Sequence, residues 1–337
     1  MLPYLPLLVA LSGLAAAAVL PATTPHVPNH LVHQFGDGFW AENIAVRSNG
    51  KLLITMIAPY PQVYQLDPLS PNPAPELIAT FPNHLAALGI DEIKPDVFVV
   101  VANNFTFSSG ASTLGSNTVY RVDMRTYEAN GKTKISVLAE IPDAVFLNGL
   151  TTVKSGPGGK ILTADSFTGQ IFEVDIKSGA SRVWMDDPIL HFPANGTKIG
   201  VNGVRYRQKD GFVYFSVLAR GTLARVPYSP HGNKEVQVLA TANAPFDDFI
   251  LAQNGDIYAT GGSTNLLYRL KVGSGRLTPV FGASDSLALA GPTAVRFGRT
   301  KLDRHTVYVT TNGGVAGPIN GTVTEPGKVV AIDTSRL

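Results

Sequence analysis

Four side chains that carry oxygen stand at matching places in this sequence, each at the start of a short run of strand-forming residues. They are Glu42, Asn148, Asn202 and Asp247. Carboxylate and amide oxygens are hard donors, which are the ligands that Ca²⁺ and similar divalent ions prefer. If the strands that carry these residues converge, the sequence predicts an oxygen-lined site where they meet.

Two further polar residues stand at or beside such a strand start. His84 begins another run and could face the same site, although a lone histidine is also a common hydrogen-bonded core residue. Asp248 follows Asp247 and could contact a substrate, or it could be a loop carboxylate that caps a turn. The pairs Asn148-Gly149 and Asn202-Gly203 also have an alternative interpretation, because Asn-Gly is an ordinary turn dipeptide.

Aromatic residues lie near the ends of the same runs or in the segments between them. Such side chains could form the apolar wall of a pocket, or they could pack between neighbouring structural units. We predict that Trp40, Phe146 and Phe167 contact a substrate. The wider set that could line an apolar pocket is Phe39, Trp40, Phe105, Phe107, Phe146, Phe167 and Phe246.

These residues are carried by a repeating unit of consecutive antiparallel strands, separated by turns that contain Gly or Pro. The second strand of the unit recurs at residues 51–55, 96–100, 160–163, 212–215, 256–259 and 306–309. A repeat every 45 to 65 residues or so is typical of propeller blades, and a closed ring protects strand edges that an open sheet would expose. Because the innermost strands line the central channel, their first residues would meet at one mouth.

The sixth unit has no fourth strand of its own before Leu337. We therefore expect residues 30–35 to supply it by pairing with the last strand. The sequence predicts an all-β, six-bladed β-propeller that is closed by an N-terminal strand, with residues 21–337 as a single domain. A pair of β-sandwiches would not explain one unit repeated six times.

The composition indicates a globular domain with a large core. The protein has 337 residues, of which 45% are hydrophobic and 15% are charged. It has no cysteine, which excludes thiol catalysis, thiolate metal sites and disulfides. The net charge is +2 without a cluster of Lys or Arg, so we expect no nucleic-acid partner. The oligomeric state stays open.

The first 20 residues are almost purely apolar and end in small residues, which is the pattern of a signal peptide. The run is too short and too rich in alanine for a membrane span, so we expect entry into the secretory pathway and no stable membrane insertion. Asn104, Asn195 and Asn320 each begin an Asn-x-Thr triplet and are candidate glycosylation sites of an exported protein.

The oxygen-bearing strand starts and the blade repeat resemble the senescence-marker-protein/gluconolactonase family of six-bladed propellers, which includes regucalcin. The resemblance implies that Glu42, Asn202 and Asp247 bind a divalent ion such as Ca²⁺, that Asn148 lies beside it, and that Asp247 acts as a base. From the same resemblance we expect that the protein uses no organic cofactor. One position departs from the family, because Phe146 stands where gluconolactonases have an arginine that holds a polyhydroxylated substrate. A phenyl ring cannot donate hydrogen bonds, so we expect small apolar or aromatic substrates.

The sequence is also similar to a fungal branch of this family that acts in secondary-metabolite biosynthesis. Some members are hetero-Diels–Alderases, which join a tropolone-derived ortho-quinone methide to humulene. This resemblance makes a hetero-Diels–Alderase the leading hypothesis, with Asp247, Asn148 and His84 as the candidate catalytic residues.

Two other functions stay open. A metal-dependent lactonase would use the ion to polarise a carbonyl and Asp247 or Asp248 to take the proton of water. A non-catalytic binding propeller would keep the fold but would not need a ring of carboxylates. A serine hydrolase is disfavoured, since the sequence has no Gly-x-Ser-x-Gly elbow.

Overall fold

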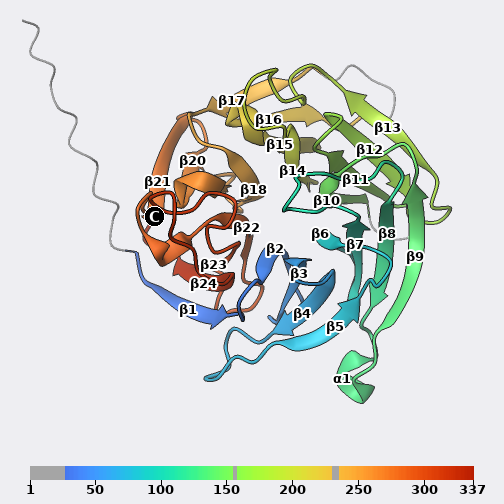
Figure 1. Cartoon of the computed structure of the whole chain (residues 1–337), viewed down its shortest axis with the longest axis horizontal. Coiled ribbons are helices and arrows are strands. Elements are labelled where there is room, and N and C mark those ends of the chain that lie inside the picture. Colours follow the sequence, from blue (N-terminus) through green and yellow to red (C-terminus); the bar gives the residue numbers. More distant parts are fainter. Residues whose placement is uncertain (1–26, 155–157, 230–234) are drawn as a thin grey trace, which may run out of the picture.

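The computed structural model describes residues 27–154, 158–229 and 235–337. In this part the protein forms six four-stranded antiparallel sheets around one axis, a six-bladed β-propeller (Figure 1). The prediction of an all-β propeller is therefore confirmed. The leader that was predicted over residues 1–20 lies outside the described residues.

The blades follow one another along the sequence, and within each the strands run from the innermost outward. The first blade contains β2 (Trp40–Val46), β3 (Leu52–Ala58), β4 (Gln62–Leu66) and β5 (Glu76–Thr80). The second and third contain β6 (Ala86–Lys94), β7 (Val97–Asn103), β8 (Asn117–Asp123) and β9 (Lys134–Ile141), then β10 (Leu147–Lys154), β11 (Lys160–Asp165), β12 (Gln170–Asp175) and β13 (Ser181–Asp186).

The fourth and fifth blades contain β14 (Val201–Arg207), β15 (Phe212–Val217), β16 (Thr222–Pro227) and β17 (Gln237–Thr241), then β18 (Phe246–Leu251), β19 (Ile257–Gly261), β20 (Leu266–Lys271) and β21 (Arg276–Gly282). The sixth contains β22 (Pro292–Phe297), β23 (Thr306–Thr311), β24 (Lys328–Asp333) and, outermost, β1 (Asn29–Gln34). The six predicted repeats correspond to β3, β7, β11, β15, β19 and β23.

The described helices are all short. They are α1 (Tyr127–Asn130) and the 3₁₀ turns η1 (Leu218–Arg220), η2 (Gly262–Thr264) and η3 (Leu287–Leu289). Within the described residues, none is long or apolar enough to cross a bilayer, which takes about 20 residues.

The ring closes by pairing the first strand with the last. β1 runs antiparallel to β24, with His30 opposite Ala331 and Gln34 opposite Lys328, and the two strands lie side by side in Figure 1. The predicted closure is confirmed. It leaves β24 paired on both sides, so its backbone does not present an open edge.

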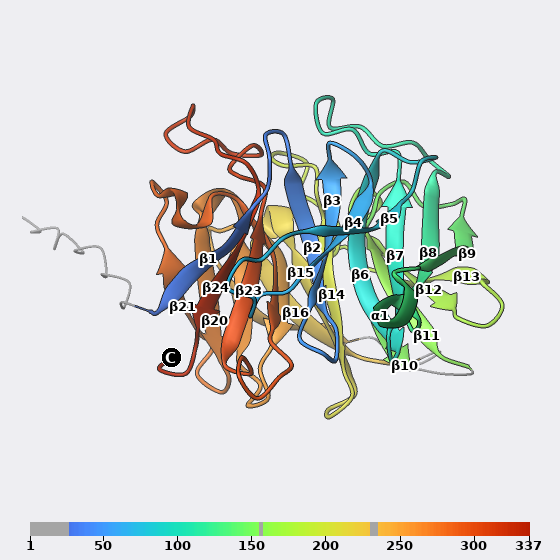
Figure 2. The ribbon, with the colours of Figure 1, turned by 90° about the horizontal axis from the view of Figure 1, so that it is seen from below.

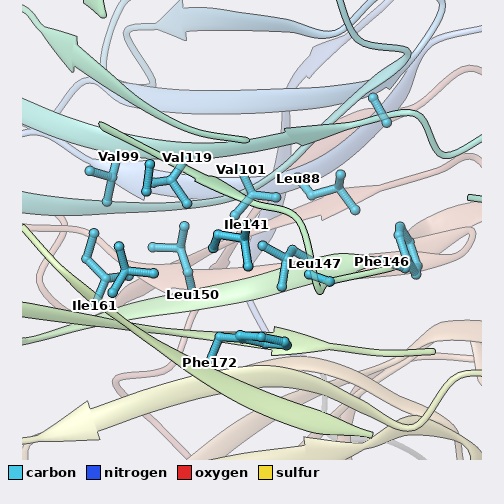
Figure 3. Close-up of a cluster of buried hydrophobic side chains, with 14 of the residues drawn as sticks. Leu88, Val99, Val101, Val119, Ile141, Phe146, Leu147, Leu150, Ile161 and Phe172 are labelled. Carbon is cyan, nitrogen blue, oxygen red and sulfur yellow. The ribbon is translucent and has the colours of Figure 1, made fainter. Parts of the chain in front are cut away.

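Hydrophobic side chains fill the spaces between neighbouring blades. One such cluster lies between the second and third blades and includes Val99, Val119, Leu150 and Phe172, all 2% exposed or less. Figure 3 shows Phe146 at one end of this cluster. The same ring therefore packs against the core and reaches the end of the channel.

Every innermost strand contains a β-bulge near its start. The register between the first and second strand of each blade shifts at residues 41–44, 87–90, 147–150, 201–204, 246–249 and 292–295. A bulge places two residues opposite one on the partner strand and re-aims their side chains. All four oxygen-bearing residues identified from the sequence lie at these bulges.

Hydroxyl groups of the second strands hold several bulges in place. The backbone N–H of Asn43 donates to Thr55 Oγ1 over 3.0 Å, and that of Gly203 donates to Ser216 Oγ over 2.8 Å. The N–H of Asp248 likewise donates to Thr260 Oγ1 over 3.1 Å. In each case the hydroxyl accepts a hydrogen bond from a backbone N–H that the bulge has taken out of the pairing between the two strands.

Glycine allows neighbouring inner strands to approach closely at these points. A Cβ on Gly203 would lie 2.4 Å from Asp248 Oδ1, and one on Gly149 would lie 2.5 Å from the carbonyl oxygen of Asn202. Asn148-Gly149 and Asn202-Gly203 lie within strands β10 and β14. The alternative interpretation of these pairs as ordinary turns is wrong.

Candidate functional site

The four oxygen-bearing residues line one pocket at one end of the channel. The cavity has a volume of about 520 Å³, and Glu42, Asn148, Asn202 and Asp247 all contribute to its surface. We call these four residues the oxygen ring. Loops between β7 and β8 and between β23 and β24 also line the pocket, and both rise at the top of Figure 2.

The two carboxylates of the ring lie in surroundings that favour their neutral form. Burial raises the pKa of Glu42 to about 7; a hydrogen bond from Trp40 Nε1 to Glu42 Oε2 over 2.6 Å opposes this, and the charge of Asp248 adds to it. Burial also raises the pKa of Asp247 well above its usual range, with further contributions from the charges of Glu42 and Asp248. A hydrogen bond from Asn202 opposes that shift. Ionising both groups would therefore place negative charge in the ring that these hydrogen bonds only partly compensate.

The donor set of the ring fits an oxygen-coordinated cation. Asn148 Oδ1 is shielded from solvent and has no hydrogen-bond partner in the described residues, which is costly for a buried acceptor. Among these same residues, no group of three or more His, Cys, Asp or Glu side chains is placed to hold a metal ion. An ion at the ring would therefore need the amide oxygens as well as the two carboxylates.

A set of aromatic rings in contact with one another lines the pocket. The ring centroids of Phe105 and Phe146 are 4.3 Å apart in a stacked arrangement, and those of Phe146 and Phe167 are 4.8 Å apart. Trp40 meets Phe107 edge to face at 4.6 Å. We call these five residues the aromatic wall. All five were expected from the sequence to line an apolar pocket, and all five line this one.

Two of the expected aromatic residues do not reach the pocket, and one that was not expected does. Phe39 stacks on Phe35 at 5.6 Å, and Phe246 packs against Tyr268. Both belong to cores between strands, so the expectation that they line the pocket is wrong. Phe192, from the loop between β13 and β14, adds to the pocket surface. That loop has no repeat pattern that could have placed it.

Asp248 lies below the oxygen ring and does not line the pocket. It is 1% exposed and its Oδ2 accepts hydrogen bonds from Arg205 Nη2, from Asn43 Nδ2 at 3.2 Å and from Arg296 Nη1 at 3.5 Å. Burial, followed by the charge of Arg296, lowers the pKa of Arg205 to about 10. We call these four residues the Asp248 network. The structure does not support substrate binding by Asp248.

The Asp248 network separates two cavities of the channel. A second cavity of about 1010 Å³ opens at the opposite end, and Arg296 is among its lining residues. The two cavities share no lining residue in the described part of the protein. A carboxylate-rich layer therefore lies above a layer that contains two guanidinium groups.

His84 lies outside the pocket. Its Nε2 is 2.9 Å from the hydroxyl of Tyr120 on β8, and the inner strand of its blade begins only at Ala86. Burial lowers the pKa of His84, which favours the neutral ring. The alternative interpretation, a hydrogen-bonded packing residue, describes it, and the catalytic assignment is not supported.

The candidate glycosylation residues differ in accessibility. Asn195 and Asn320 are exposed, whereas Asn104 is half-buried and its Oδ1 is shielded. Glycosylation stays a prediction at all three. Thr197, the third residue of the Asn195 triplet, lines the pocket, so a glycan on Asn195 would lie near its opening.

Fold and site together define a six-bladed propeller with an oxygen ring and an aromatic wall at one end of its channel. Solved structures share this fold. Regucalcin from Agrobacterium tumefaciens, a calcium-binding protein, has a TM-score of 0.62 and 14% identity over 92% of this chain and 96% of its own. A luciferin-regenerating enzyme has a TM-score of 0.65 and 11% identity over 92% and 96% of the two proteins. At such identities these comparisons establish the fold alone.

The sequence relatives are more specific. The protein is 28% identical over 316 residues to a protein of a Phoma species named "Putative hetero-Diels-Alderase", an alignment that includes 85% of this chain and 87% of the relative. It is 27% identical over 343 residues to "Putative hetero-Diels-Alderase asR5" of Sarocladium schorii, over 92% and 84% of the two proteins. No family model matches the sequence. The resemblance stated from the sequence, to regucalcin-like propellers and to proteins named hetero-Diels–Alderases, is confirmed.

Proposed function

We propose that this protein is a hetero-Diels–Alderase of secondary metabolism, which couples a tropolone-derived ortho-quinone methide with humulene. The observation that carries the proposal is the pocket itself. Its lining combines an aromatic wall of five rings with the amide and carboxylate groups of the oxygen ring. The names of the two sequence relatives support the same chemistry.

The pocket suits a reaction that needs orientation more than nucleophilic attack. A cycloaddition joins two partners without a covalent enzyme intermediate, so the protein contributes mainly by holding them in a reactive pose. Fixing two reactants in this way removes up to about 7–11 kcal/mol of barrier in the most favourable cases. The aromatic wall can bind an apolar hydrocarbon by contact area, without a directional hydrogen bond.

The reaction has two balanced steps. In the first, the ring hydroxyl of a hydroxymethyl-tropolone loses its proton to Asp247, the C–O bond of the hydroxymethyl group breaks, and the hydroxyl leaves as water with that proton. In the second, the exocyclic methylene forms a C–C bond and the ring oxygen forms a C–O bond to the two carbons of one humulene double bond. Asn148 and Asn202 would hold the ring oxygens by hydrogen bonds.

We also propose that Glu42, Asn202 and Asp247, with Asn148 beside them, hold a divalent ion such as Ca²⁺. The unpartnered Asn148 Oδ1 and the two uncompensated carboxylates support this. When bound, the ion would supply positive charge next to the oxygens of the substrate. The contribution of the protein itself would then be to orient the tropolone ring and to exclude water.

The test is a turnover assay with a hydroxymethyl-tropolone and humulene, read by chiral chromatography. We expect a single enantiomer of the cycloadduct above the racemic background. Phe107→Ala removes an aromatic side chain that is already 37% exposed, so the fold should persist while kcat/KM falls about tenfold, the loss expected for part of a phenyl contact. Phe212→Ala, on β15 outside the pocket, is the matched control and should leave turnover unchanged. A racemic product from the wild type would refute the proposal.

A second candidate function is a lactonase for apolar or aromatic lactones, and the oxygen ring is the observation that favours it. A Lewis-acidic ion and a nearby carboxylate base are the two groups that metal-dependent ester hydrolysis requires. A panel of aryl and alkyl lactones distinguishes the two functions. Calcium-dependent hydrolysis together with a racemic cycloadduct would establish the lactonase, and inactivity in both assays would favour a binding propeller.

A further inference from the structure

The pocket has two unlike walls. The aromatic wall comes from the first three blades, through β2, the loop after β7, and both ends of the β10–β11 hairpin. The side formed by the fifth and sixth blades is lined by Pro245, Gly262, Ser263, Gly291, Asn312, Ala316 and Gly317, which we call the small-residue wall. The fifth and sixth blades lie across the axis from the second and third in a ring of six (Figure 1). Residues that follow the third blade or belong to the fourth, among them Lys198 and Leu218, line the pocket between the two walls. The two sides of the pocket therefore differ in the chemistry that they offer a ligand.

Neither the backbone conformation nor the packing around Gly262 requires glycine at this position. It lies in η2 without a left-handed φ, and a Cβ built on it would meet nothing closer than the carbonyl oxygen of Pro245 at 3.7 Å. Gly291 is different, because its φ is +60° and a Cβ would lie 1.9 Å from Asn312 Oδ1. Gly291 is required by the fold. The missing side chain at Gly262 instead leaves space in the pocket.

The small-residue wall also offers polar groups. Ser263 contributes to the pocket surface, and Asn312 does so with its Oδ1 already accepting from the N–H of Gly314 over 2.8 Å. No hydrogen bond from Asn312 Nδ2 occurs within the described residues, so this amide can donate to a ligand oxygen. A flat, oxygen-bearing ring fits such a surface, whereas the aromatic wall across the pocket lacks polar atoms apart from the Trp40 indole N–H.

We propose that the pocket contains two subsites, and that Gly262 sets the width of the second. The aromatic wall binds an apolar hydrocarbon, and the small-residue wall binds a planar ring that carries hydroxyl or carbonyl oxygens. Assigning the two subsites to the two reactants of a cycloaddition rests on the proposed function. The binding preference of each wall does not.

Trp40 provides a direct readout of pocket occupancy. The protein has two tryptophans, and Trp184 is 2% exposed in the core next to Tyr228, so a change of emission on ligand binding reports Trp40. Two probes represent the two chemistries. Tropolone stands for the planar oxygen-bearing ring, and naphthalene stands for the apolar partner. Neither probe requires turnover.

We expect opposite effects from variants of the two walls. Gly262→Val should weaken tropolone binding by at least about tenfold and naphthalene binding by less than about twofold, because an added group that occupies one subsite excludes its ligand. Phe107→Ala should weaken naphthalene more than tropolone. Gly36→Val is the matched control. Gly36 also lacks a left-handed φ, and the nearest atom to a Cβ built on it would be Phe39 Cε2 at 3.7 Å, but Gly36 lies outside the pocket.

Equal losses for both probes, or no loss for either, in Gly262→Val would overturn the proposal. Thermal unfolding checks that the variant is folded, and Gly262→Ala gives a milder substitution of the same kind. If the binding pattern holds but no enantioenriched cycloadduct forms, the two subsites stand and the proposed function fails. If the cycloadduct forms but the pattern is absent, the proposed function stands and the two subsites fail.

Discussion

At the scale of single residues, the site is defined by the carboxylates of Glu42 and Asp247, which the protein brings close together although neither forms an ion pair within the described residues. Burial raises the cost of ionising both Glu42 and Asp247, and the charge of Glu42 adds to that cost for Asp247. Nearby arginines do not relieve it, because Arg205 and Arg296 bind Asp248 one layer below. An ion at the ring would supply the missing charge.

Glu42→Gln tests the ion directly. The wild-type protein should gain about 2–3 kcal/mol of unfolding free energy when Ca²⁺ reaches roughly one hundred times its dissociation constant, since a ligand that binds only the folded state stabilises it. The variant should lose this gain, because an amide supplies one neutral oxygen in place of a carboxylate. Differential scanning fluorimetry with and without Ca²⁺ measures both, with exposed Glu140→Gln as the control. A full calcium response in Glu42→Gln would contradict the proposed ion site.

Because the pKa of Glu42 is raised, we expect the stability of the metal-free protein, measured in EDTA, to decrease as the pH rises. The folded state keeps its proton up to a pH of about 7, whereas the unfolded protein releases it near the ordinary value of 4.5. Between these values the folded state binds more protons, so its stability decreases as the pH rises, by on the order of 3 kcal/mol in total for this group. Urea unfolding at pH 5 and pH 8 measures the slope. The Glu42→Gln variant should lack this contribution. An unchanged slope in the variant would show that Glu42 does not cause the pH dependence.

Sequence reasoning found the oxygen ring because the same residue types recur at one position of a repeated blade. It failed for His84, whose blade begins its inner strand two residues later, so the apparent alignment with Glu42 was a coincidence of spacing. It also failed for Asp248, because only the geometry of a bulge decides which of two adjacent side chains faces the pocket. Phe192 and Gly262 lie in connections that carry no periodic pattern.

At the scale of elements, the bulges of the inner strands decide which side chains reach the channel. Their hydroxyl supports tie each inner strand to its own blade and sometimes to the next. Thr260 Oγ1 lies 2.9 Å from the carbonyl oxygen of Asp248 within its blade and 2.9 Å from that of Thr293 in the neighbouring one. The position of Asp247 thus depends on a threonine that never contacts the pocket.

Thr260→Val should destabilise the protein and weaken ligand binding together. The substitution keeps the shape of a fully buried side chain but leaves the Asp248 N–H without its acceptor, which costs about 1–3 kcal/mol. Thr278→Val on the outer strand β21 is the control, because its hydroxyl makes only a 3.5 Å contact with Arg269. Urea unfolding and Trp40 fluorescence titration measure the two effects. Equal stability of the two variants would show that the hydroxyl does not support the bulge.

At the scale of the whole molecule, closure of the ring joins segments from the two ends of the described residues. The blade repeat made this closure predictable from the sequence, since the sixth repeat had only three strands and the N-terminal strand belonged to no repeat. Its register was not predictable, because β1 contains an irregularity between Leu31 and His33 that only the pairing with β24 reveals. The site depends on closure, because its two walls belong to opposite blades.

Deleting residues 27–36 should open the ring. β24 would then present an unpaired edge with buried Val330 and Ile332 exposed beside it, so we expect loss of cooperative unfolding and aggregation. Fusing the same segment after Leu337 through a short linker should restore a monodisperse protein, because the start of β1 lies beside the end of β24, with Asn29 opposite Ile332. Size-exclusion chromatography and thermal unfolding compare the two forms. A stable, soluble deletion variant would contradict this role for β1.

The separation of the two cavities by the Asp248 network also sets an order of events. The network lies between the oxygen ring and the second cavity, so we expect whatever reaches the ring to enter and leave past the aromatic wall. A small ion at the ring would lie beneath any larger ligand, so it would have to load first and depart last. Kinetics should then show compulsory-order addition, and a saturating ligand should slow the removal of the ion by a chelator.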